Sequence, residues 1–234
     1  MNDDDVLGQA LLWLNDPLNW QGSLGVPALV AEHLGMSATA VLLAAVVALP
    51  LGVWLGHRDR GGTVTVVATN TSRALPTLAL LYIFAMTGLG FGNRPTIVAA
   101  ALFAVPPILA NAFTGIRGVD PAARDAARGM GMSGGRSLLA VELPLALPLI
   151  AAGLRTAAVQ VVATVPLAAL VGGGGLGTLI VTGFATRRFG EVVAGAVLVA
   201  ALCLLVEAVL AGAQRVLTPE PLRVRAGSAG RSAA

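Results

Sequence analysis

Long apolar segments separated by short polar ones make up most of this chain. Five of them have the roughly 20 apolar residues that a helix needs to cross about 30 Å of hydrocarbon; they cover about 36–56, 63–89, 96–117, 143–171 and 192–214. They are continuous runs of Ala, Leu and Val, whereas strands of a membrane β-barrel alternate in polarity. The pattern therefore predicts an all-α integral membrane protein built as a five-helix bundle.

The overall composition agrees with a membrane location. The 234 residues are 56% hydrophobic and only 12% charged, whereas soluble domains are about a quarter charged. Mean hydropathy is +0.82. The single cysteine, Cys203, lies in the fifth apolar segment, so a disulfide framework and a cysteine metal cluster are both excluded. We expect Cys203 to be a core residue.

The basic residues predict how the chain is oriented in its membrane. All fifteen are arginine, and ten of them lie after the first segment, between the third and fourth, or after the fifth: Arg58, Arg60, Arg117, Arg124, Arg128, Arg136, Arg215, Arg223, Arg225 and Arg231. Short cytoplasmic loops collect positive charge, so we expect the N-terminus outside and the C-terminus inside a bacterial cytoplasmic membrane. Because the arginines flank membrane segments and form no stripe with aromatic residues, nucleic acid is not an expected partner.

The two ends of the chain differ from the segments between them. Residues 6–14 are apolar but too short to span, and they follow aspartates in place of the basic start of a secretory signal. We expect an interfacial helix there, with Trp13 and Trp20 at headgroup level. The predicted organisation is an extracytoplasmic N-terminal segment over 1–34, a transmembrane domain over 35–216 and a disordered cytoplasmic tail over 217–234.

Prolines interrupt two of the apolar segments, and a run of glycines follows the fourth. Pro76 breaks the second segment, and Pro106 and Pro107 kink the third one turn before Asn111. In lipid such breaks persist only where other helices or a water-filled cavity satisfy the freed backbone groups, so Pro76 and Asn111 are candidate pathway or gate residues. A run of four glycines at the predicted outer mouth joins them: Gly172, Gly173, Gly174 and Gly175. The apolar residues around this run favour a short re-entrant or interfacial segment over a flexible external loop.

Three further polar residues lie in or beside apolar segments. Arg155 is about twelve residues into the fourth segment, where a charge is costly and faces a cavity or the bundle interior. It therefore has a pathway or gating role, or it forms a structural pair with a polar group such as Gln160 or Asn111. Glu207 in the fifth segment is expected to be structural, either snorkelling or paired. His33, just before the first segment, is expected at the interface.

One polar, glycine-rich loop at about 118–143 separates the third and fourth apolar segments, and the predicted topology makes it cytoplasmic. Asp120 is a good N-cap and Pro121 suits a first helical position, so a short helix is predicted from Pro121. On it Arg124 and Arg128 share a face, and Asp125 can pair with Arg128. Glycines then end this helix, and a second one should begin at about residue 136. These residues alone permit either a helix that docks on a partner or a solvated connector.

The spacing within this loop resembles a known signature. Asp125-Ala126-Ala127, three residues, Gly131, nine residues, Val141, one residue and Leu143-Pro144 follow the cytoplasmic pattern E-A-A-x3-G-x9-I-x-L-P of ABC-importer permeases, with Asp for Glu and Val for Ile. Three stretches, RALPTLALL, VELPLALPLIAAGLRTA and LVGGGGLGTLI, further resemble permeases for osmoprotectants such as glycine betaine, carnitine and choline. The resemblance covers about 73–177 densely.

This resemblance implies a fold, a mechanism and a set of partners. The fold would be a type I ABC-importer permease, in which the cytoplasmic loop forms a coupling helix seated in a cleft of an ATPase subunit. The coupling residues would be Arg124, Asp125, Ala126, Ala127, Arg128, Gly131, Leu143 and Pro144. A second permease subunit and an extracytoplasmic binding protein would complete the importer. The chain would bind no cofactor or metal, with ATP and Mg²⁺ held by the ATPase.

Other observations bear on what the chain does itself. The P-loop pattern requires a lysine and this sequence has none, so ATP hydrolysis by that route belongs to another chain and this one is not expected to be an enzyme. No aromatic cage for a quaternary ammonium group is readable in the sequence, so high-affinity recognition is assigned to the binding protein. The alternatives are an ABC permease for another solute such as an amino acid or a thione, an ion-coupled secondary transporter, and a membrane scaffold.

Overall fold

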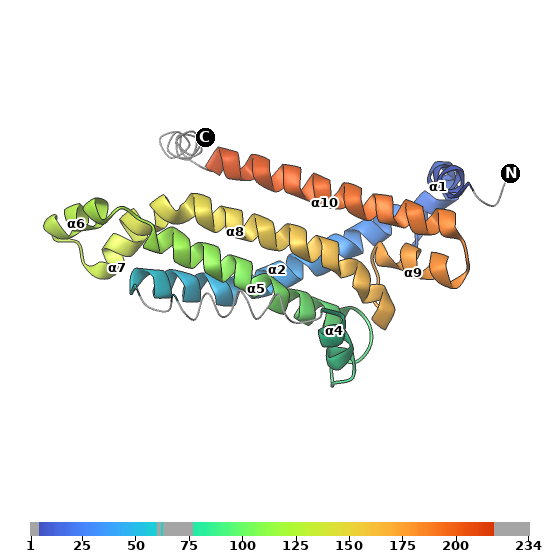
Figure 1. The fold of residues 1–234 in the computed structure, drawn as a ribbon, viewed down its shortest axis with the longest axis horizontal. Coiled ribbons are helices and arrows are strands. Elements are labelled where there is room, and N and C mark those ends of the chain that lie inside the picture. Colours follow the sequence, from blue (N-terminus) through green and yellow to red (C-terminus); the bar gives the residue numbers. More distant parts are fainter. Residues whose placement is uncertain (1–4, 60–61, 63–76, 218–234) are drawn as a thin grey trace. The chain divides into compact units, whose positions relative to one another are not determined.

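The computed structural model describes residues 5–59, 62 and 77–217, and its secondary structure within these ranges is entirely helical (Figure 1). Four helical segments are long and apolar enough to cross a membrane. They are α2 (Val26–His57), α5 (Asn93–Arg117), the continuous run Gly134–Val171, and α10 (Phe189–Leu217). The prediction of an all-α membrane protein is confirmed.

Shorter helices connect and flank these four. At the N-terminal end are α1 (Val6–Asn15) and the 3-10 turn η1 (Pro17–Trp20), followed later by α4 (Thr77–Ala85) and α6 (Pro121–Gly129). The run Gly134–Val171 consists of α7 (Gly134–Ser137), the π-helical turn η2 (Leu138–Glu142), α8 (Leu143–Thr164) and the 3-10 segment η3 (Val165–Val171). Helix α9 (Gly177–Ala185) precedes α10.

The second predicted apolar segment, 63–89, is described only in part. Helix α4 covers Thr77–Ala85 of it, while residues 63–76, including Pro76, lie outside the described residues. Residues 218–234 of the expected tail also lie outside them. The helix count of five and the expected tail therefore stay predictions.

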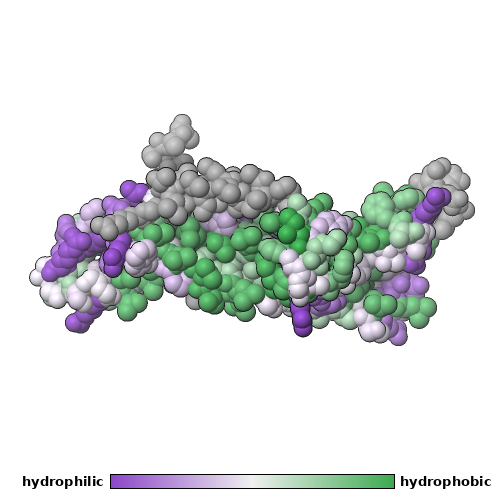
Figure 2. Space-filling view, turned by 90° about the horizontal axis from the view of Figure 1, so that it is seen from below, coloured by the Kyte–Doolittle hydropathy of each residue, from purple (hydrophilic) through white to green (hydrophobic). Residues whose placement is uncertain are grey.

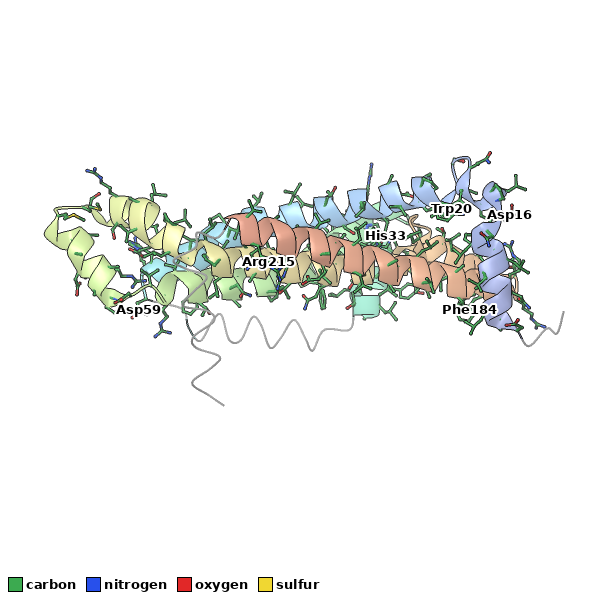
Figure 3. The ribbon with its side chains drawn as sticks, turned by 90° about the horizontal axis from the view of Figure 1, so that it is seen from above. Asp16, Trp20, His33, Asp59, Phe184 and Arg215 are labelled. Atoms are coloured by element: carbon green, nitrogen blue, oxygen red, sulfur yellow. The ribbon has the colours of Figure 1, made fainter. Side chains whose placement is uncertain are left out.

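The first membrane helix begins earlier than its apolar run predicts. Helix α2 starts at Val26, ten residues before the expected start at 36, so the expected domain boundary between 34 and 35 falls inside a continuous helix. His33, expected at the membrane interface, is thus part of a continuous helix. His33 lies on α2 (Figure 3), is fully buried, and its Nε2 is 2.9 Å from the Val162 carbonyl oxygen of α8.

The chain divides into two compact units, and each long helix contributes residues to both. Unit 1 comprises 1–44, 73–104 and 158–206, and unit 2 comprises 45–72, 105–157 and 207–234. Unit 1 packs around a buried cluster of Leu29, Val162, Leu176, Leu179 and Leu202. Unit 2 packs around Ala112, Ile116, Ala146 and Ile150. Small side chains in this second cluster allow its helices to approach closely.

Glycines make the closest helix contacts of unit 2. A Cβ atom on Gly52 would lie 2.8 Å from the Leu109 carbonyl oxygen, and one on Gly56 would lie 2.8 Å from the Phe113 carbonyl oxygen. These two glycines, four residues apart, seat α2 on α5 in the manner of small-residue packing between membrane helices. A Cβ on Gly153 would likewise lie 3.0 Å from the Pro107 carbonyl oxygen, so α8 packs on the proline pair of α5.

Helix α5 continues through Pro106 and Pro107 without a break in its assignment. The predicted interruption of the third segment is therefore not a break in secondary structure. Protein packs against one face of this part of α5, because Ala104, Ile108 and Ala112 are each fully buried. This is the setting in which a membrane helix tolerates proline.

The exposed surface of the long helices is largely apolar (Figure 2). On α2 it includes Leu42 and Val46, and on α10 it includes Leu204 and Val209. Hydrophilic side chains gather where the coupling loop with α6 and α7 lies (Figure 2). Apolar faces of this extent would be an aggregation liability in water, and they suit contact with lipid.

Candidate coupling site

Helix α6 begins and ends as its sequence predicts. The Asp120 carboxylate accepts a hydrogen bond from the Ala122 backbone N–H at 2.9 Å, and Pro121 takes the first helical position. At the other end Gly131 has φ +75°, a left-handed conformation that glycine adopts at little cost. The predicted start at Pro121 is confirmed, and Gly131 makes the turn that follows the helix.

Arg124 and Arg128, predicted to share a face, lie one turn apart on α6, but their side chains differ in burial and in their partners. The Arg128 side chain is 74% exposed and pairs with Asp125 at 3.3 Å. The Arg124 side chain is only 18% exposed, and it donates a hydrogen bond to the Ile116 carbonyl oxygen. Ala127 is buried and Ala126 exposed. Helix α6 thus rests on the protein through Arg124 and Ala127, and exposes Asp125, Ala126 and Arg128.

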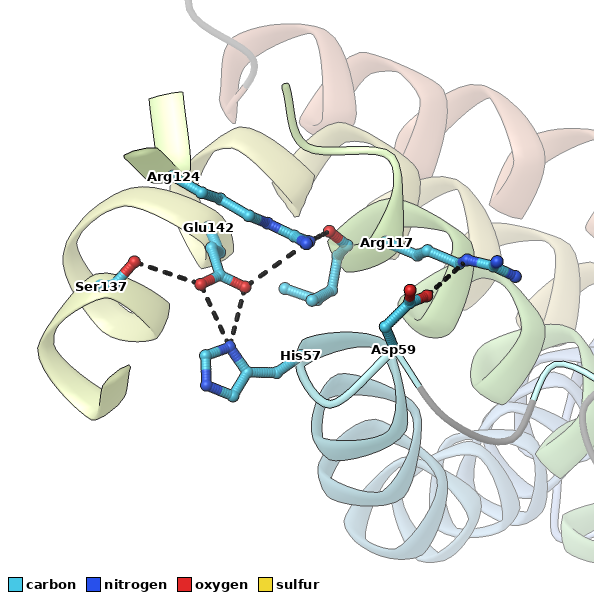
Figure 4. A network of polar contacts seen from close by, with 7 residues as sticks. His57, Asp59, Arg117, Arg124, Ser137 and Glu142 are labelled. Atoms are coloured by element: carbon cyan, nitrogen blue, oxygen red, sulfur yellow. Dashed lines mark hydrogen bonds and ion pairs between the residues drawn. The ribbon is translucent and has the colours of Figure 1, made fainter. Parts of the chain in front are cut away.

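Glu142 is the centre of the polar contacts beneath α6 (Figure 4). It is 2% exposed. Its Oε2 lies 2.9 Å from His57 Nδ1 and 3.7 Å from Arg124 Nη2. Ser137 donates its hydroxyl hydrogen to Glu142 Oε1 at 3.2 Å. One buried carboxylate therefore contacts the end of α2, helix α6 and helix α7.

Glu142 needs polar partners because its carboxylate is buried. Removing an ionised group from water costs several kcal/mol, and this cost is recovered only with paired charges and hydrogen bonds. Arg124 and Ser137 supply such partners, and His57 lies at hydrogen-bond distance from both carboxylate oxygens. Glu142 consequently holds α6 in one position relative to the end of α2. We name His57, Arg124, Ser137 and Glu142 the Glu142 cluster.

The backbone around Glu142 is also unusual. The helical run after the loop begins at Gly134, before the predicted start near 136, and includes the π-helical turn Leu138–Glu142. Such turns are rare and frequently occur at functional sites. The last two signature residues follow it. Leu143 packs on the unit 2 core, whereas Pro144 is exposed in the first turn of α8. The fourth segment therefore starts upstream of Pro144.

A second ion pair of unit 2 joins the ends of α2 and α5. Asp59 Oδ1 lies 2.8 Å from Arg117 Nε (Figure 4), with side chains 65% and 55% exposed. Exposed pairs of this kind contribute at most about 1 kcal/mol. Of the two contacts at this end of α2, the buried one at Glu142 is the stronger determinant of position.

Sequence reasoning missed Glu142, His57 and Ser137. Glu142 occupies the unspecified position between Val141 and Leu143 in the signature, so the motif itself does not mark it. A usable signal was present, because Glu142 is the one carboxylate within the otherwise apolar run 138–151, and such a residue requires a partner. That its partner is His57, 85 positions earlier in the chain, is settled only by folding.

The candidate pathway residues do not form one site. Asn111 donates from Nδ2 to the Pro107 carbonyl oxygen of its own helix at 2.8 Å. Arg155 Nε lies 3.4 Å from Glu207 Oε1, so Arg155 has a polar partner as one prediction expected, and that partner is Glu207 and not the suggested Gln160 or Asn111. These residues belong to unit 2, whereas Gly172–Gly175 belong to unit 1 and Pro76 lies outside the described residues. The described structure therefore does not bring the candidate pathway residues together, and their pathway role stays a prediction.

The four glycines form a packed turn between η3 and α9. Gly172 and Gly175 have φ values of +73° and +81°, in the left-handed region that favours glycine. Gly173 and Gly175 are buried.

Within the described part of the chain, no three His, Cys, Asp or Glu residues are grouped so that they could hold a metal ion.

Comparison with known proteins extends these observations. Residues 48–220 match the family described as "Binding-protein-dependent transport system inner membrane component". The chain is 40% identical over 192 residues to the glycine betaine/carnitine/choline transport system permease protein OpuCB of Bacillus subtilis, covering 82% of this chain and 88% of the relative. It is 34% identical to the osmoprotectant import permease protein OsmW of Salmonella typhimurium, covering 83% and 93%.

The fold has a counterpart among solved structures. The inward-facing MetNI methionine ABC transporter aligns with a TM-score of 0.72 at 23% identity, covering 88% of this chain and 100% of that chain. A second inward-facing form aligns with a TM-score of 0.68 at 24% identity, covering 80% and 94%. The arrangement of helices is thus that of an ABC-importer permease.

Proposed function

Because the chain belongs to the family of binding-protein-dependent transport system inner membrane components, we propose that it is the permease subunit of an ATP-driven importer for osmoprotectants such as glycine betaine, choline and carnitine. The observation that supports this cargo is identity of 34% to 41% with permeases named for such solutes, over at least 80% of this chain. Permeases for different solutes share this fold. The likeness to a methionine transporter therefore does not change the proposed cargo.

Coupling to ATP hydrolysis is assigned to α6. The helix exposes Asp125, Ala126 and Arg128, and small side chains let a partner's groove come close. Below it, the Glu142 cluster fixes its orientation. Residues Arg124 to Arg128, with Gly131, Leu143 and Pro144, therefore form our proposed coupling region for a separate ATPase that carries ATP and Mg²⁺. This chain has no lysine for a P-loop.

The same proposal includes orientation and the remaining partners. The described arginines of unit 2 that lie outside α8 are Arg58, Arg117, Arg124, Arg128, Arg136 and Arg215, against Arg94, Arg187 and Arg188 in unit 1. Positive charge collects on cytoplasmic ends, so unit 2 carries the cytoplasmic end and α1 lies outside. A second permease subunit and an extracytoplasmic binding protein complete the importer in the bacterial cytoplasmic membrane.

Solute uptake by the assembled importer tests the proposal. The permease, its ATPase and its binding protein would be expressed together, and uptake of labelled glycine betaine, choline and carnitine would be measured. We expect ATP-dependent uptake of at least one of them, lost when the P-loop lysine of the ATPase is replaced. Uptake that survives this replacement but stops with an ionophore would show an ion-coupled transporter. ATP-dependent uptake of methionine alone would refute the cargo.

A further inference from the structure

A second cluster of polar contacts, in unit 1, ties the glycine turn to two long helices. Glu32 lies near the start of α2, and Asn93 is the first residue of α5. The turn itself, Gly172–Gly175, joins η3 to α9. Residues from three regions of the sequence therefore meet here, and neither the coupling region nor the family signature includes them.

The hydrogen bonds of this cluster link Glu32, Asn93 and the glycine turn to one another. Asn93 donates from Nδ2 to Glu32 Oε1 at 2.7 Å. The Gly174 backbone N–H donates to Asn93 Oδ1 at 2.8 Å, and the Gly175 backbone N–H donates to Glu32 Oε2 at 3.0 Å. Every donor in the set meets an acceptor, and both carboxylate oxygens of Glu32 are used.

Close approach explains why this turn requires glycine. A Cβ atom on Gly174 would overlap the Glu32 carboxylate, and one on Gly173 would lie 2.9 Å from both Asn93 Oδ1 and the Ala168 carbonyl oxygen. The glycine run is thus the surface on which the Glu32 and Asn93 side chains rest. A backbone bond from Gly92 N–H to the Val171 carbonyl oxygen, at 2.8 Å, joins the same two regions.

The energetics of these bonds suit reversible contact. Hydrogen bonds to a charged group contribute about 1.5–3 kcal/mol each when the group is well placed. Glu32 is exposed, so water replaces its partners at little cost when the bonds break. This differs from Glu142, whose carboxylate is buried and loses its solvation if its partners leave.

We propose that Glu32 and Asn93 form a releasable latch that holds the glycine turn to α2 and α5, and that solute transport requires this latch. Both are positioning residues, acting through the turn and not through contact with solute. When the latch is formed, the connection between α8 and α9 moves with the parts of α2 and α5 that belong to unit 1. This inference rests on the proposed function.

A reciprocal exchange of the two side chains tests the latch. Glu32→Gln places two amide groups opposite each other, so one donor faces another donor in either orientation. Asn93→Asp places two carboxylates opposite each other. In the double variant the amide at 32 donates to the carboxylate at 93, which restores the bond between the two side chains, and both glycine N–H groups have acceptors. Asp16→Asn is the control, because it removes a carboxylate of unit 1 that bonds only within η1, to Leu18.

Hydrogen exchange on the purified chain in detergent reports the latch without any partner. We expect exchange at the amides of Gly174 and Gly175 to be about tenfold faster in each single variant, the factor for about 1.4 kcal/mol. The double variant and the control should exchange at the wild-type rate. Wild-type exchange in both single variants would overturn the latch.

Uptake per ATP hydrolysed then reports whether transport needs it. In the assembled importer with labelled glycine betaine, each single variant should lower this ratio about tenfold, and the double variant should restore it to within about twofold, since the two sites act as one pair. A merely structural role would lower uptake and hydrolysis together and leave the ratio unchanged, which would refute the proposal. If the wild-type importer shows no ATP-dependent uptake, the proposed function fails, while hydrogen exchange still tests the latch.

Discussion

At the scale of single residues, the most informative side chain is Glu142. It is buried, its charge is balanced by Arg124, and His57 and Ser137 are at hydrogen-bond distance. Nearby exposed pairs such as Asp59–Arg117 have similar distances but face water. Distance alone does not show which of these contacts contributes more to stability, but burial does. A buried charge that loses its partners has no water to replace them.

Replacing Glu142 should therefore cost more than replacing an exposed carboxylate. Glu142→Gln keeps the shape but removes the charge that faces Arg124 and His57, and we expect it to lower the free energy of unfolding by about 2–4 kcal/mol. The control Asp59→Asn should cost at most about 1 kcal/mol. Thermal unfolding of both variants in detergent is the measurement. Equal losses would show that the Glu142 cluster does not hold α6.

At the scale of elements, glycines determine how closely helices pack. Gly56 of α2 touches α5, whereas no atom lies within 4 Å of a Cβ placed on Gly35 of the same helix. Their surroundings differ although their sequence settings are alike. In membrane helices, close backbone approach takes the place of the hydrophobic driving force that water provides.

A matched pair of alanine substitutions in α2 tests this packing. Gly35→Ala should leave stability unchanged or raise it by up to about 1 kcal/mol, the helix propensity of alanine over glycine. Gly56→Ala should lower stability, because its Cβ would lie 2.8 Å from the Phe113 carbonyl oxygen. Thermal unfolding in detergent and gel filtration compare them. If Gly56→Ala is as stable as Gly35→Ala, α2 does not pack on α5 through this glycine.

At the scale of the whole molecule, polar chemistry is confined to a few places in a largely apolar protein. Unit 2 carries the Glu142 cluster and α6, and unit 1 carries the glycine turn with Glu32 and Asn93. An exposed, capped helix beside a buried anchor is suited to receive a partner. Each of the four long helical segments within the described residues contributes to both units.

Loss of the ATPase partner is the expected result of changing the exposed face of α6. Ala126→Arg adds a long charged side chain where we propose a groove closes, and should reduce co-purified ATPase at least about tenfold, because docked surfaces tolerate little added volume. The control Ala185→Arg alters an exposed alanine at the end of α9 and should retain the ATPase. Full retention of the ATPase by the Ala126→Arg variant would show that the coupling contact does not lie on this face of α6.

Local patterns in the sequence were sufficient for the elements. Apolar runs predicted the membrane helices, Asp120-Pro121 predicted the start of α6, and the spacing from Asp125 to Pro144 predicted the family. Each depends on residues close together in the chain, and the restricted geometry of helices in lipid leaves few alternatives. The start of α2 was misjudged because His33 interrupts the apolar pattern, although α8 supplies a buried partner for it.

What the sequence by itself determined was thus the class of protein, most of its described helices and the loop that we propose for contact with an ATPase. Only the tertiary structure decided which polar groups meet: Glu142 with His57, Arg155 with Glu207, and Glu32 with Asn93 and the glycine turn. The physical reason is that a helix is specified by neighbours within a few residues, whereas the partner of a buried charge or of a close backbone contact is specified by packing between segments far apart in the chain.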